Sequence, residues 1–314
     1  MNSFRKLLKT LKTDKSILIQ AHDFPDHDAL VSAYGLARLL DTYGIESTVC
    51  YHGTIQSFSL NKAMQQLSIQ AHSIEDLQHY TSAQIIAVDG IPTISSVGDI
   101  VILIDHHNRN GPFPYMFSDV RVDYGSCATI IWEYFFEEKV LIDKNLATAL
   151  LMGIMMDTAF MTRGVSPIDL KAYSNLFFQA DWELSSSILK NSLSVKDLGV
   201  FKEAIRSYKL FGSMVFIVIR KSCTSEVQAL VTDYFLTLQE VRVAVTVTKQ
   251  GKDYRISVRS EDKDFPSDGI IYYALKDIGE GGGHVHMGGG MIPGSDFPGM
   301  YQLESRFRKA LKKL

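Results

Sequence analysis

Histidine and aspartate gather in a few short segments of this sequence, and these residue types can bind metal ions or transfer protons. The first segment, His22 to Asp28, contains two histidines and three aspartates. A single aspartate here would be expected to cap a helix. Several carboxylates in one turn repel each other unless a cation neutralises them. The segment therefore indicates a metal site.

Further candidates follow two short apolar runs, Gln84–Val88 and Asp99–Ile104. Asp89 comes directly after the first run, and Asp105-His106-His107 comes directly after the second. Alone, Asp89-Gly90 is typical of a turn, and adjacent histidines fit a solvated loop. However, ligands bind at the carboxyl edge of open α/β sheets, where such strands end. Convergence of three strand ends on Asp and His therefore favours a site.

Asp157 is a fourth candidate, because it ends the apolar helix predicted for Lys144–Met156. A carboxylate at a helix C-terminus opposes the helix dipole. A metal ion would offset this cost, and exposure of the helix end to solvent is the alternative explanation.

The elements that must position these residues follow from hydrophobic periodicity. Short apolar runs, typical of strands buried on both faces, alternate with amphipathic helices in the first half of the chain. This alternation predicts an α/β fold with a mostly parallel sheet flanked by helices. The predicted strands are Ser16–Ala21, Glu46–Cys50, Gln84–Val88 and Asp99–Ile104; the predicted helices are Met1–Leu11, Ala29–Tyr43, Ser57–Leu67, Ile74–Tyr80, Cys127–Glu138, Lys144–Met156 and Pro167–Gln179.

The second half predicts a smaller α/β domain. Strands are expected at Met214–Arg220, Val241–Val247 and Tyr254–Arg259, with Gly251 in a hairpin turn, and helices at Ser267–Lys276 and Gln302–Lys313. The segment Gly279–Gly299 contains nine of the 22 glycines. Trp182–Lys209 is polar and helical in pattern. The expected domains are residues 1–183 and 210–314, joined by a helical connector at 184–209.

Composition excludes several classes of protein. The 314 residues carry a net charge of −3, so a broad basic face for long duplexes is not expected. Cys50, Cys127 and Cys223 show no metal-binding spacing, and free thiols are expected. No apolar stretch is long enough to span a bilayer, and no targeting segment is visible. A cytoplasmic protein without membrane contact is expected.

The ordered set of motifs resembles the DHH phosphoesterases. The match begins with His-x-x-x-Asp-x-Asp at His22 and continues with Asp89, Asp105-His106-His107 and Gly-x-x-x-Asp-Thr ending at Thr158. The C-terminal half resembles the DHH-associated domain, through Arg259-Ser260 and Gly281-Gly282-Gly283-His284. Size and layout resemble the bacterial nanoRNase and adenosine 3′,5′-bisphosphate phosphatase branch. One departure is Ala159, where the family commonly has glycine.

The resemblance implies a centre of two divalent metal ions, usually Mn²⁺. His22, Asp26 and Asp89 would hold one ion, and Asp28, Asp89, His106 and Asp157 the other, with Asp89 as the bridge. The chemistry agrees, since carboxylates with imidazoles and no thiolate suit Mn²⁺ better than structural zinc. His107 would act on the substrate, and Asp105 would orient a histidine. Candidate substrate-binding residues are Arg109, Arg259, Ser260, Gly281, Gly282, Gly283 and His284.

The expected function is Mn²⁺-dependent hydrolysis of phosphoesters in a cleft between the two domains. The expected substrates are short single-stranded oligoribonucleotides, linear dinucleotides or adenosine 3′,5′-bisphosphate, which makes the protein an oligoribonuclease or exonuclease that binds nucleic acid. An exopolyphosphatase or pyrophosphatase is the alternative enzyme. A non-catalytic nucleotide-binding regulator is the alternative of another class, although every expected ligand position is filled. The sequence leaves a homodimer open.

Overall fold

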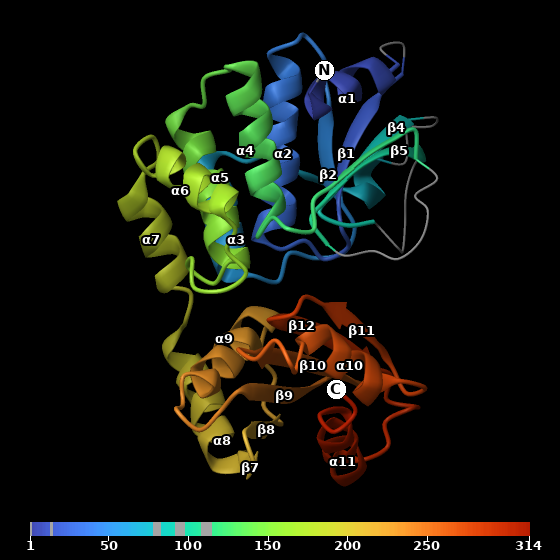
Figure 1. Cartoon of the computed structure of the whole chain (residues 1–314), viewed down its shortest axis with the longest axis vertical. Helices are drawn as coiled ribbons and strands as arrows, with labels where there is room; N and C mark the ends of the chain where they lie inside the picture. The colour runs from blue at the N-terminus through green and yellow to red at the C-terminus, as the bar shows by residue number, and fades with distance from the viewer. Residues whose placement is uncertain (1, 13–14, 78–82, 92–97, 108–114) are drawn as a thin grey trace. The chain divides into compact units, whose positions relative to one another are not determined.

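The chain separates into two compact units, Met1–Ser192 and Leu193–Leu314, each with its own sheet and core (Figure 1). The computed structural model describes residues 2–12, 15–77, 83–91, 98–107 and 115–314. The border between the units falls inside the segment 184–209 that the sequence assigns to a connector. In this segment α7 (Trp182–Lys190) packs in the first unit, and α8 (Leu198–Ser207) packs in the second.

The first unit is built on a six-stranded sheet in the order β3-β2-β1-β4-β5-β6, and every described strand pair is parallel. The residues of β1 and β4 are all buried, as expected for central strands of a parallel sheet. The predicted α/β fold with a parallel sheet is therefore confirmed. The strands are β1 (Ile17–Ala21), β2 (Thr48–Tyr51), β3 (His72–Ser73), β4 (Ala83–Val88), β5 (Gly98–Asp105) and β6 (Phe117–Val120).

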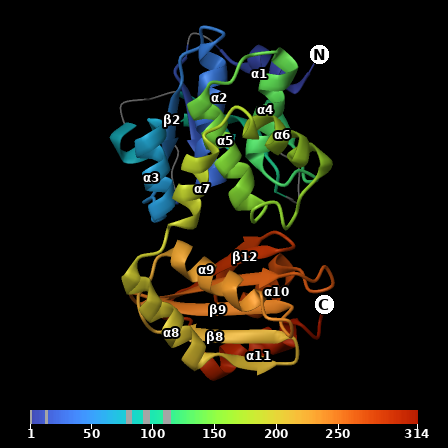
Figure 2. The same cartoon turned by 90° about the vertical axis from the view of Figure 1, so that its left-hand side faces the viewer.

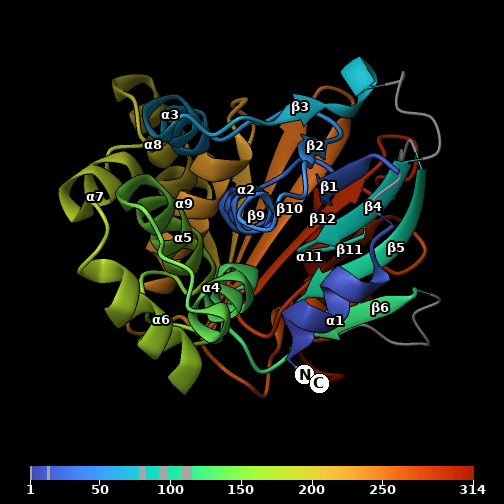
Figure 3. The same ribbon diagram turned by 90° about the horizontal axis from the view of Figure 1, so that it is seen from above.

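Three helices pack against one another on one face of this sheet: α2 (His27–Asp41), α4 (Cys127–Glu138) and α5 (Lys144–Asp157) (Figures 1 and 3). Gly35 of α2 permits their close approach, because a Cβ there would lie 2.9 Å from Ile131 and 3.1 Å from Leu150. The remaining helices of the unit are α1 (Ser3–Thr10), α3 (Phe58–Leu67), the 3₁₀ turn η1 (Ile74–Leu77), α6 (Pro167–Phe177) and α7.

The predicted elements of the first unit differ from the structure mainly at short segments. The helix predicted for Ile74–Tyr80 is a 3₁₀ turn as far as Leu77, and residues 78–80 lie outside the described residues. The sequence does not predict β3 or β6. These strands have only two and four residues, at the two edges of the sheet, so neither has the long apolar run of a central strand.

The second unit has a mixed six-stranded sheet in the order β11-β12-β10-β9-β8-β7, covered by helices on both faces. Its neighbouring strands are antiparallel except β8 and β9. The helices α8 and α9 cover one face of the sheet, and α10 and α11 cover the other (Figure 2). Alternate residues of β8 enter these two cores: Met214 and Phe216 pack with α10 and α11, and Val215 and Ile217 with α8 and α9. The elements are β7 (Lys209–Phe211), β8 (Met214–Ile219), α9 (Ser225–Leu236), β9 (Val243–Gln250), β10 (Asp253–Ser260), α10 (Ser267–Leu275), β11 (Glu280–Gly283), β12 (Met287–Ile292) and α11 (Met300–Ala310), with the 3₁₀ turn η2 (Val195–Asp197) before α8.

Glycines shape two hairpins of this sheet. Gly251 forms the predicted turn between β9 and β10, with a φ of 61°. The glycine-rich segment forms regular structure, since Gly281–Gly283 of β11 pair with Gly288–Gly290 of β12. Side chains on β12 would collide with α10: a Cβ on Gly288 would lie 2.6 Å from Ile271, and one on Gly290 2.4 Å from Leu275. These glycines therefore let α10 pack closely against the hairpin. The sequence does not predict α9, whose β-branched residues obscure its helical pattern.

The helices in the described part of the chain are all too short or too polar to cross a membrane.

Candidate metal centre

The candidate residues meet because β1, β4 and β5 are neighbouring parallel strands whose carboxyl ends lie at one edge of the sheet. His22 directly follows β1, Asp89 directly follows β4, and Asp105 ends β5. Asp157 reaches the same place from the last residue of α5. The convergence of strand ends expected from the sequence is therefore present in the structure.

The segment after β1 presents His22, Asp26 and Asp28. The Nδ1 atom of His22 lies 2.9 Å from the carbonyl oxygen of Asp23. This contact makes Nδ1 a donor, so Nε2 is the ring nitrogen that faces Asp26 (3.8 Å) and Asp89 (3.9 Å). Asp26 also caps α2 by accepting a hydrogen bond from the Ala29 amide. In contrast, His27 is buried, and its Nε2 lies 2.9 Å from the Ser59 hydroxyl, away from this cluster.

Asp89 stands between two imidazoles. Its Oδ1 lies 3.2 Å from Nε2 of His106, and its Oδ2 lies 3.9 Å from Nε2 of His22. The residue is buried, and within the described part of the chain its Oδ1 has no hydrogen-bond partner. Burying a carboxylate oxygen without a donor is costly. Asp89 also has a positive φ of 59°, a conformation that aspartate tolerates better than most residues.

His106 is held in the same way as His22. Its Nδ1 lies 3.1 Å from the carbonyl oxygen of Tyr124, so its Nε2 is directed at three carboxylates. These are Asp89 and Asp157, both at 3.2 Å, and Asp28 at 3.8 Å. A ring nitrogen fixed by a carbonyl while the other faces carboxylates is the arrangement of a metal-binding histidine.

Asp28 anchors the cluster to α4. Its Oδ2 accepts a hydrogen bond from the Cys127 amide (2.6 Å), and its Oδ1 accepts one from the Ala128 amide (2.8 Å). These amides are in the first turn of α4, where the backbone N–H groups lack partners inside the helix. The two hydrogen bonds fix the carboxylate while its Oδ2 still faces His106.

The backbone after Asp157 is left-handed at three consecutive residues, with φ values of 47°, 58° and 62° at Ala159, Phe160 and Met161. The Thr158 hydroxyl, which contacts the Ile154 carbonyl and the Met161 amide, ties this turn to the end of α5. A left-handed conformation favours glycine. The glycine common in the resembling family at position 159 therefore fits the conformation better than the alanine of this chain.

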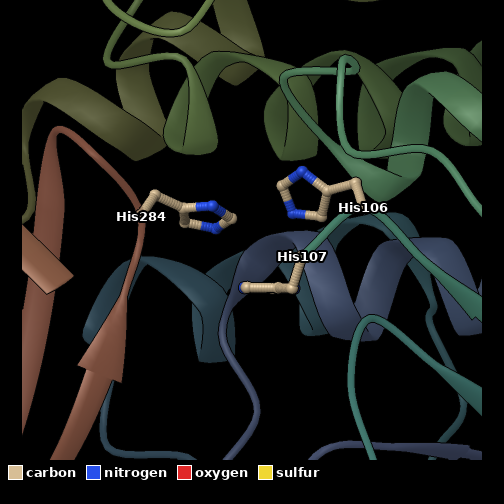
Figure 4. A group of neighbouring side chains, drawn as sticks. All are labelled: His106, His107 and His284. Atoms are coloured by element: carbon tan, nitrogen blue, oxygen red, sulfur yellow. The ribbon is translucent and has the colours of Figure 1, made fainter. Parts of the chain in front are cut away.

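Asp105 organises the adjacent histidines and, with Asp89 and His107, also forms a set of ligand atoms that lie within 4.8 Å of one another. Its Oδ1 accepts hydrogen bonds from the amides of His106 and His107 and lies 2.8 Å from Nδ1 of His107. The rings of His106 and His107 have their centroids 4.5 Å apart and project from the segment after β5 (Figure 4). His106 is buried and His107 is half-buried, so the two histidines face different surroundings.

The electrostatics of the cluster favour a cation. Burial lowers the pKa of His22, but the carboxylates of Asp26 and Asp89 outweigh it and raise that pKa to about 10. For His106, burial is outweighed by Asp157 and Asp89, and its pKa is raised well above the ordinary value. Burial, Asp89 and Asp157 raise the pKa of Asp28. Burial raises the pKa of Asp157 to about 6, against the influence of His106. These carboxylates thus require a positive counter-charge.

Three sets of ligand atoms overlap at Asp89, and one of them consists of Asp89, Asp105 and His107. His22, Asp26 and Asp89 form another set, and Asp28, Asp89 and His106 form the third; within each set the donor atoms lie within 4.8 Å of one another. Asp157 adjoins the third set through His106. Carboxylates and imidazoles without thiolate suit Mn²⁺ or Mg²⁺. The donor chemistry and Oδ1 of Asp89, which accepts no hydrogen bond within the described residues, both fit divalent ions.

The candidate substrate-binding residues of the second unit mostly make contacts within that unit. Nε of Arg259 lies 3.2 Å from Asp233 of α9. Ser260 is buried, and its hydroxyl contacts the backbone of Asp262. The amide of His284 donates to the Met287 carbonyl, closing the β11–β12 hairpin. Gly281–Gly283 lie in β11. Arg109 lies outside the described residues.

Sequence reasoning missed the groups that fix the ligand-type side chains. The Tyr124 carbonyl and the Cys127 and Ala128 amides are backbone atoms, which every residue type can supply. The only available signal was the helix predicted to begin at Cys127, because a helix N-terminus offers unpaired N–H groups.

Known proteins are similar in sequence to this chain, either over nearly its whole length or over about half of it. The chain is 28% identical, over 98% of its length, to an uncharacterised protein of Methanocaldococcus jannaschii, of which it covers 64%. It is 29% identical over 46% of its length to a probable manganese-dependent inorganic pyrophosphatase of Streptococcus thermophilus. It is 27% identical over 50% of its length to a probable bifunctional oligoribonuclease and PAP phosphatase of Streptococcus mutans. The matches cover 49% and 50% of these two proteins.

A solved structure has a similar fold, and a family model matches part of the sequence. The crystal structure of an exopolyphosphatase-related protein from Bacteroides fragilis superposes with a TM-score of 0.74 at 20% identity, covering 99% of this chain and 94% of that one. Residues 16–154 match the model of the DHH family, N-terminal domain. Five of the six ligand-type residues lie inside this match, and Asp157 follows it by three positions. Residues 16–154 of this chain therefore form a DHH-family N-terminal domain.

Proposed function

We propose that this chain is a divalent-metal-dependent phosphohydrolase that uses Mn²⁺ and acts on short oligoribonucleotides, linear dinucleotides or adenosine 3′,5′-bisphosphate. The observation that carries the proposal is that the set His22, Asp26 and Asp89 and the set Asp28, Asp89 and His106 share Asp89. His22, Asp26 and Asp89 would hold one ion, and Asp28, Asp89, His106 and Asp157 the other. Two bound divalent ions would activate water and neutralise the charge on phosphoryl oxygens.

The chain's own residues have separate tasks in this reaction. His22 and His106 present Nε2 because the Asp23 and Tyr124 carbonyls hold their Nδ1 atoms. Asp105 holds Nδ1 of His107, which directs the other ring nitrogen of His107 away from Asp105. As an imidazolium, His107 would give a proton to the leaving oxygen when the phosphorus–oxygen bond breaks. The carboxylate of Asp105 stabilises that positive charge.

The substrate class rests on similarity to the oligoribonuclease and PAP phosphatase of Streptococcus mutans. Arg259 is the candidate contact to a substrate phosphate. Ser260 follows it in the sequence, and His284 and the glycines of β11 belong to the β11–β12 hairpin, whose strand β12 pairs with β10. The Arg259 guanidinium is oriented by Asp233, by the Ser257 hydroxyl and by the Val258 carbonyl, and guanidinium groups suit the geometry of phosphate.

Inorganic pyrophosphatase activity is the second candidate. It is supported by similarity to the probable manganese-dependent pyrophosphatase of Streptococcus thermophilus. Both reactions would use the same metal ligands and differ in what the rest of the substrate contacts.

The deciding experiment is a substrate panel with Mn²⁺, Mg²⁺ or a chelator. The panel contains a diribonucleotide, a five-mer, a long oligomer, adenosine 3′,5′-bisphosphate, a cyclic dinucleotide, pyrophosphate and tripolyphosphate. Metal-dependent turnover of the short nucleotides, with little on pyrophosphate, supports the first candidate. Turnover of pyrophosphate alone supports the second. Stoichiometric metal binding without turnover of any substrate would favour a nucleotide-binding regulator.

Arg259→Ala tests substrate contact directly. It should lower kcat/KM on the preferred nucleotide by roughly 10-fold or more, because a charged hydrogen bond is lost. The loss should be smaller on bis-p-nitrophenyl phosphate, which offers the second unit little to hold. Equal losses on both substrates would mean that Arg259 only supports the fold, and a thermal melt of the variant checks this independently.

A further inference from the structure

A second group of charged side chains lies in the second unit, around a cavity of about 360 Å³. The cavity lies between α8 and the carboxyl end of β8. Three cationic side chains line it: Lys202 and Arg206, one turn apart on α8, and Arg220, directly after β8. The rest of the lining is Gly199, Glu203, Ser207 and Val218.

A fourth cation reaches the rim of this cavity. The ammonium group of Lys221 lies over Gly199, so near that a side chain at position 199 would displace it. Glycine is an unfavourable residue inside a helix, by about 1 kcal/mol relative to alanine. In α8 the absence of a Cβ makes room for a positive charge beside the cavity.

These cations have no carboxylate partner. Within the described residues, Lys202, Arg206, Arg220 and Lys221 form no ion pair, whereas Arg5, Arg38 and Arg121 of the first unit do. The single carboxylate of the cavity is committed elsewhere. Glu203 accepts hydrogen bonds from the backbone amides of Arg220 (3.0 Å) and Lys221 (2.9 Å) and so fixes the end of β8. Like charges held together without counter-charges repel each other.

We propose that this cavity binds a compact phosphate anion: inorganic phosphate, pyrophosphate or the phosphate group of a mononucleotide. Several donors in one place suit an anion with several charged oxygens, and guanidinium groups bind phosphate through two N–H groups at once. A volume of about 360 Å³ is at the small end of ligand sites, which favours a small molecule over a polymer. The site is separate from the ligand sets of the first unit and does not depend on the proposed hydrolysis.

Isothermal titration calorimetry of the full chain with pyrophosphate tests the proposal. The titration is run without divalent metal, since the acidic cluster around Asp89 then repels anions, and is repeated with Mn²⁺. We expect one pyrophosphate per chain, with an affinity that falls as NaCl is raised. The variant Arg206→Ala/Arg220→Ala should bind roughly 10-fold more weakly or worse.

The matched control is Lys249→Ala/Lys252→Ala, which removes two exposed positive charges from the β9–β10 hairpin of the same unit. It should bind pyrophosphate as the unchanged protein does, and circular dichroism should show both variants folded. Unchanged affinity in Arg206→Ala/Arg220→Ala would overturn the proposal, as would an equal loss in the control. Binding of a single-stranded oligoribonucleotide but not of pyrophosphate or AMP would replace the small anion with a nucleic acid.

Discussion

The carboxyl edge of the parallel sheet is rich in Asp and His, and the β11–β12 hairpin is rich in glycine. The residues of these two regions have different roles in the structure. At the sheet edge, Asp89 keeps a buried oxygen without a hydrogen-bond donor in the described chain. In the hairpin, backbone groups pair with each other, and missing side chains make room for α10. A buried polar group that the protein leaves unsatisfied is better evidence for a ligand than an unusual composition.

The two units also differ in charge. Residues 1–192 contain 14 Lys and Arg against 21 Asp and Glu, a net charge of −7; residues 193–314 contain 18 against 14, a net charge of +4. The first unit therefore suits cations, and the second suits anions such as phosphates.

The largest expected effect is a difference between two buried aspartates of the first unit, Asp89 and Asp169. Asp89→Ala should lose metal and reduce kcat by roughly 1,000-fold or more, because a ligand shared by the overlapping sets is removed. Asp169→Ala should keep the metal but lower the free energy of unfolding by about 3 kcal/mol. Asp169 accepts hydrogen bonds from Gly125, Ser166 and Thr129, so it is already satisfied by the protein.

Metal analysis, turnover and denaturant unfolding of these variants provide the comparison. Asp89→Asn is the backbone control, since asparagine also tolerates the positive φ at this position. Normal turnover of Asp89→Ala with full metal content would refute the ligand assignment.

The adjacent residues His106 and His107, at the carboxyl edge of the sheet, should respond differently to substitution. His106→Ala should lower Mn²⁺ affinity, because Nε2 of His106 faces Asp89 and Asp157 at 3.2 Å. His107→Ala should retain Mn²⁺ and lose roughly 100-fold in kcat, the usual contribution of a proton donor. Calorimetric Mn²⁺ titration and single-turnover kinetics distinguish the two. If His107→Ala loses an ion and His106→Ala does not, the roles are reversed.

In the hairpin, neighbouring glycines should respond differently to substitution. Gly283 has a φ of 150°, and a Cβ there would lie 2.2 Å from the Met287 carbonyl oxygen, so Gly283→Ala should destabilise the second unit by about 2 kcal/mol. Gly282 has no atom within 4 Å of an added Cβ, so Gly282→Ala should change stability by less than about 0.5 kcal/mol. Thermal unfolding measures both.

Gly282 then becomes the position at which a binding role can be tested. If Gly282→Val folds normally but lowers kcat/KM on nucleotides, the backbone of β11 contacts substrate. If turnover is unchanged, the hairpin glycines serve packing alone.

The smallest effect concerns the turn after Asp157. Ala159→Gly should stabilise the first unit by about 0.5 kcal/mol, because glycine relieves the left-handed backbone but gains freedom in the unfolded chain. Ala37→Gly in α2 is the control and should destabilise by about 1 kcal/mol. Destabilisation by both substitutions in a chemical denaturation experiment would mean that the turn carries no strain at position 159.

Period-2 and period-3.6 patterns were sufficient for most long elements, such as β1, β4, β8 and the helices α2, α4 and α5, which bury apolar faces, but not for α9. They failed for β3 and β6, which are short, and for β11 and β12, whose glycines carry no side-chain pattern. Ile74–Tyr80 has helical spacing, but its described part forms only a 3₁₀ turn.

The positions of the candidate site residues could be predicted wherever the strands that carry them could be predicted. Parallel strands place their carboxyl ends together, so the positions of His22, Asp89 and His106 follow from the strand assignments. The contacts of Asp28 with α4 and of Arg259 with Asp233 depend on how helices pack, and no local pattern encodes them.

All six ligand-type side chains lie between His22 and Asp157, inside the first unit. The candidate metal ligands of such a chain therefore belong to one continuous stretch of sequence. Mutation, duplication or replacement of the second unit can then change what is recognised without dismantling the cluster.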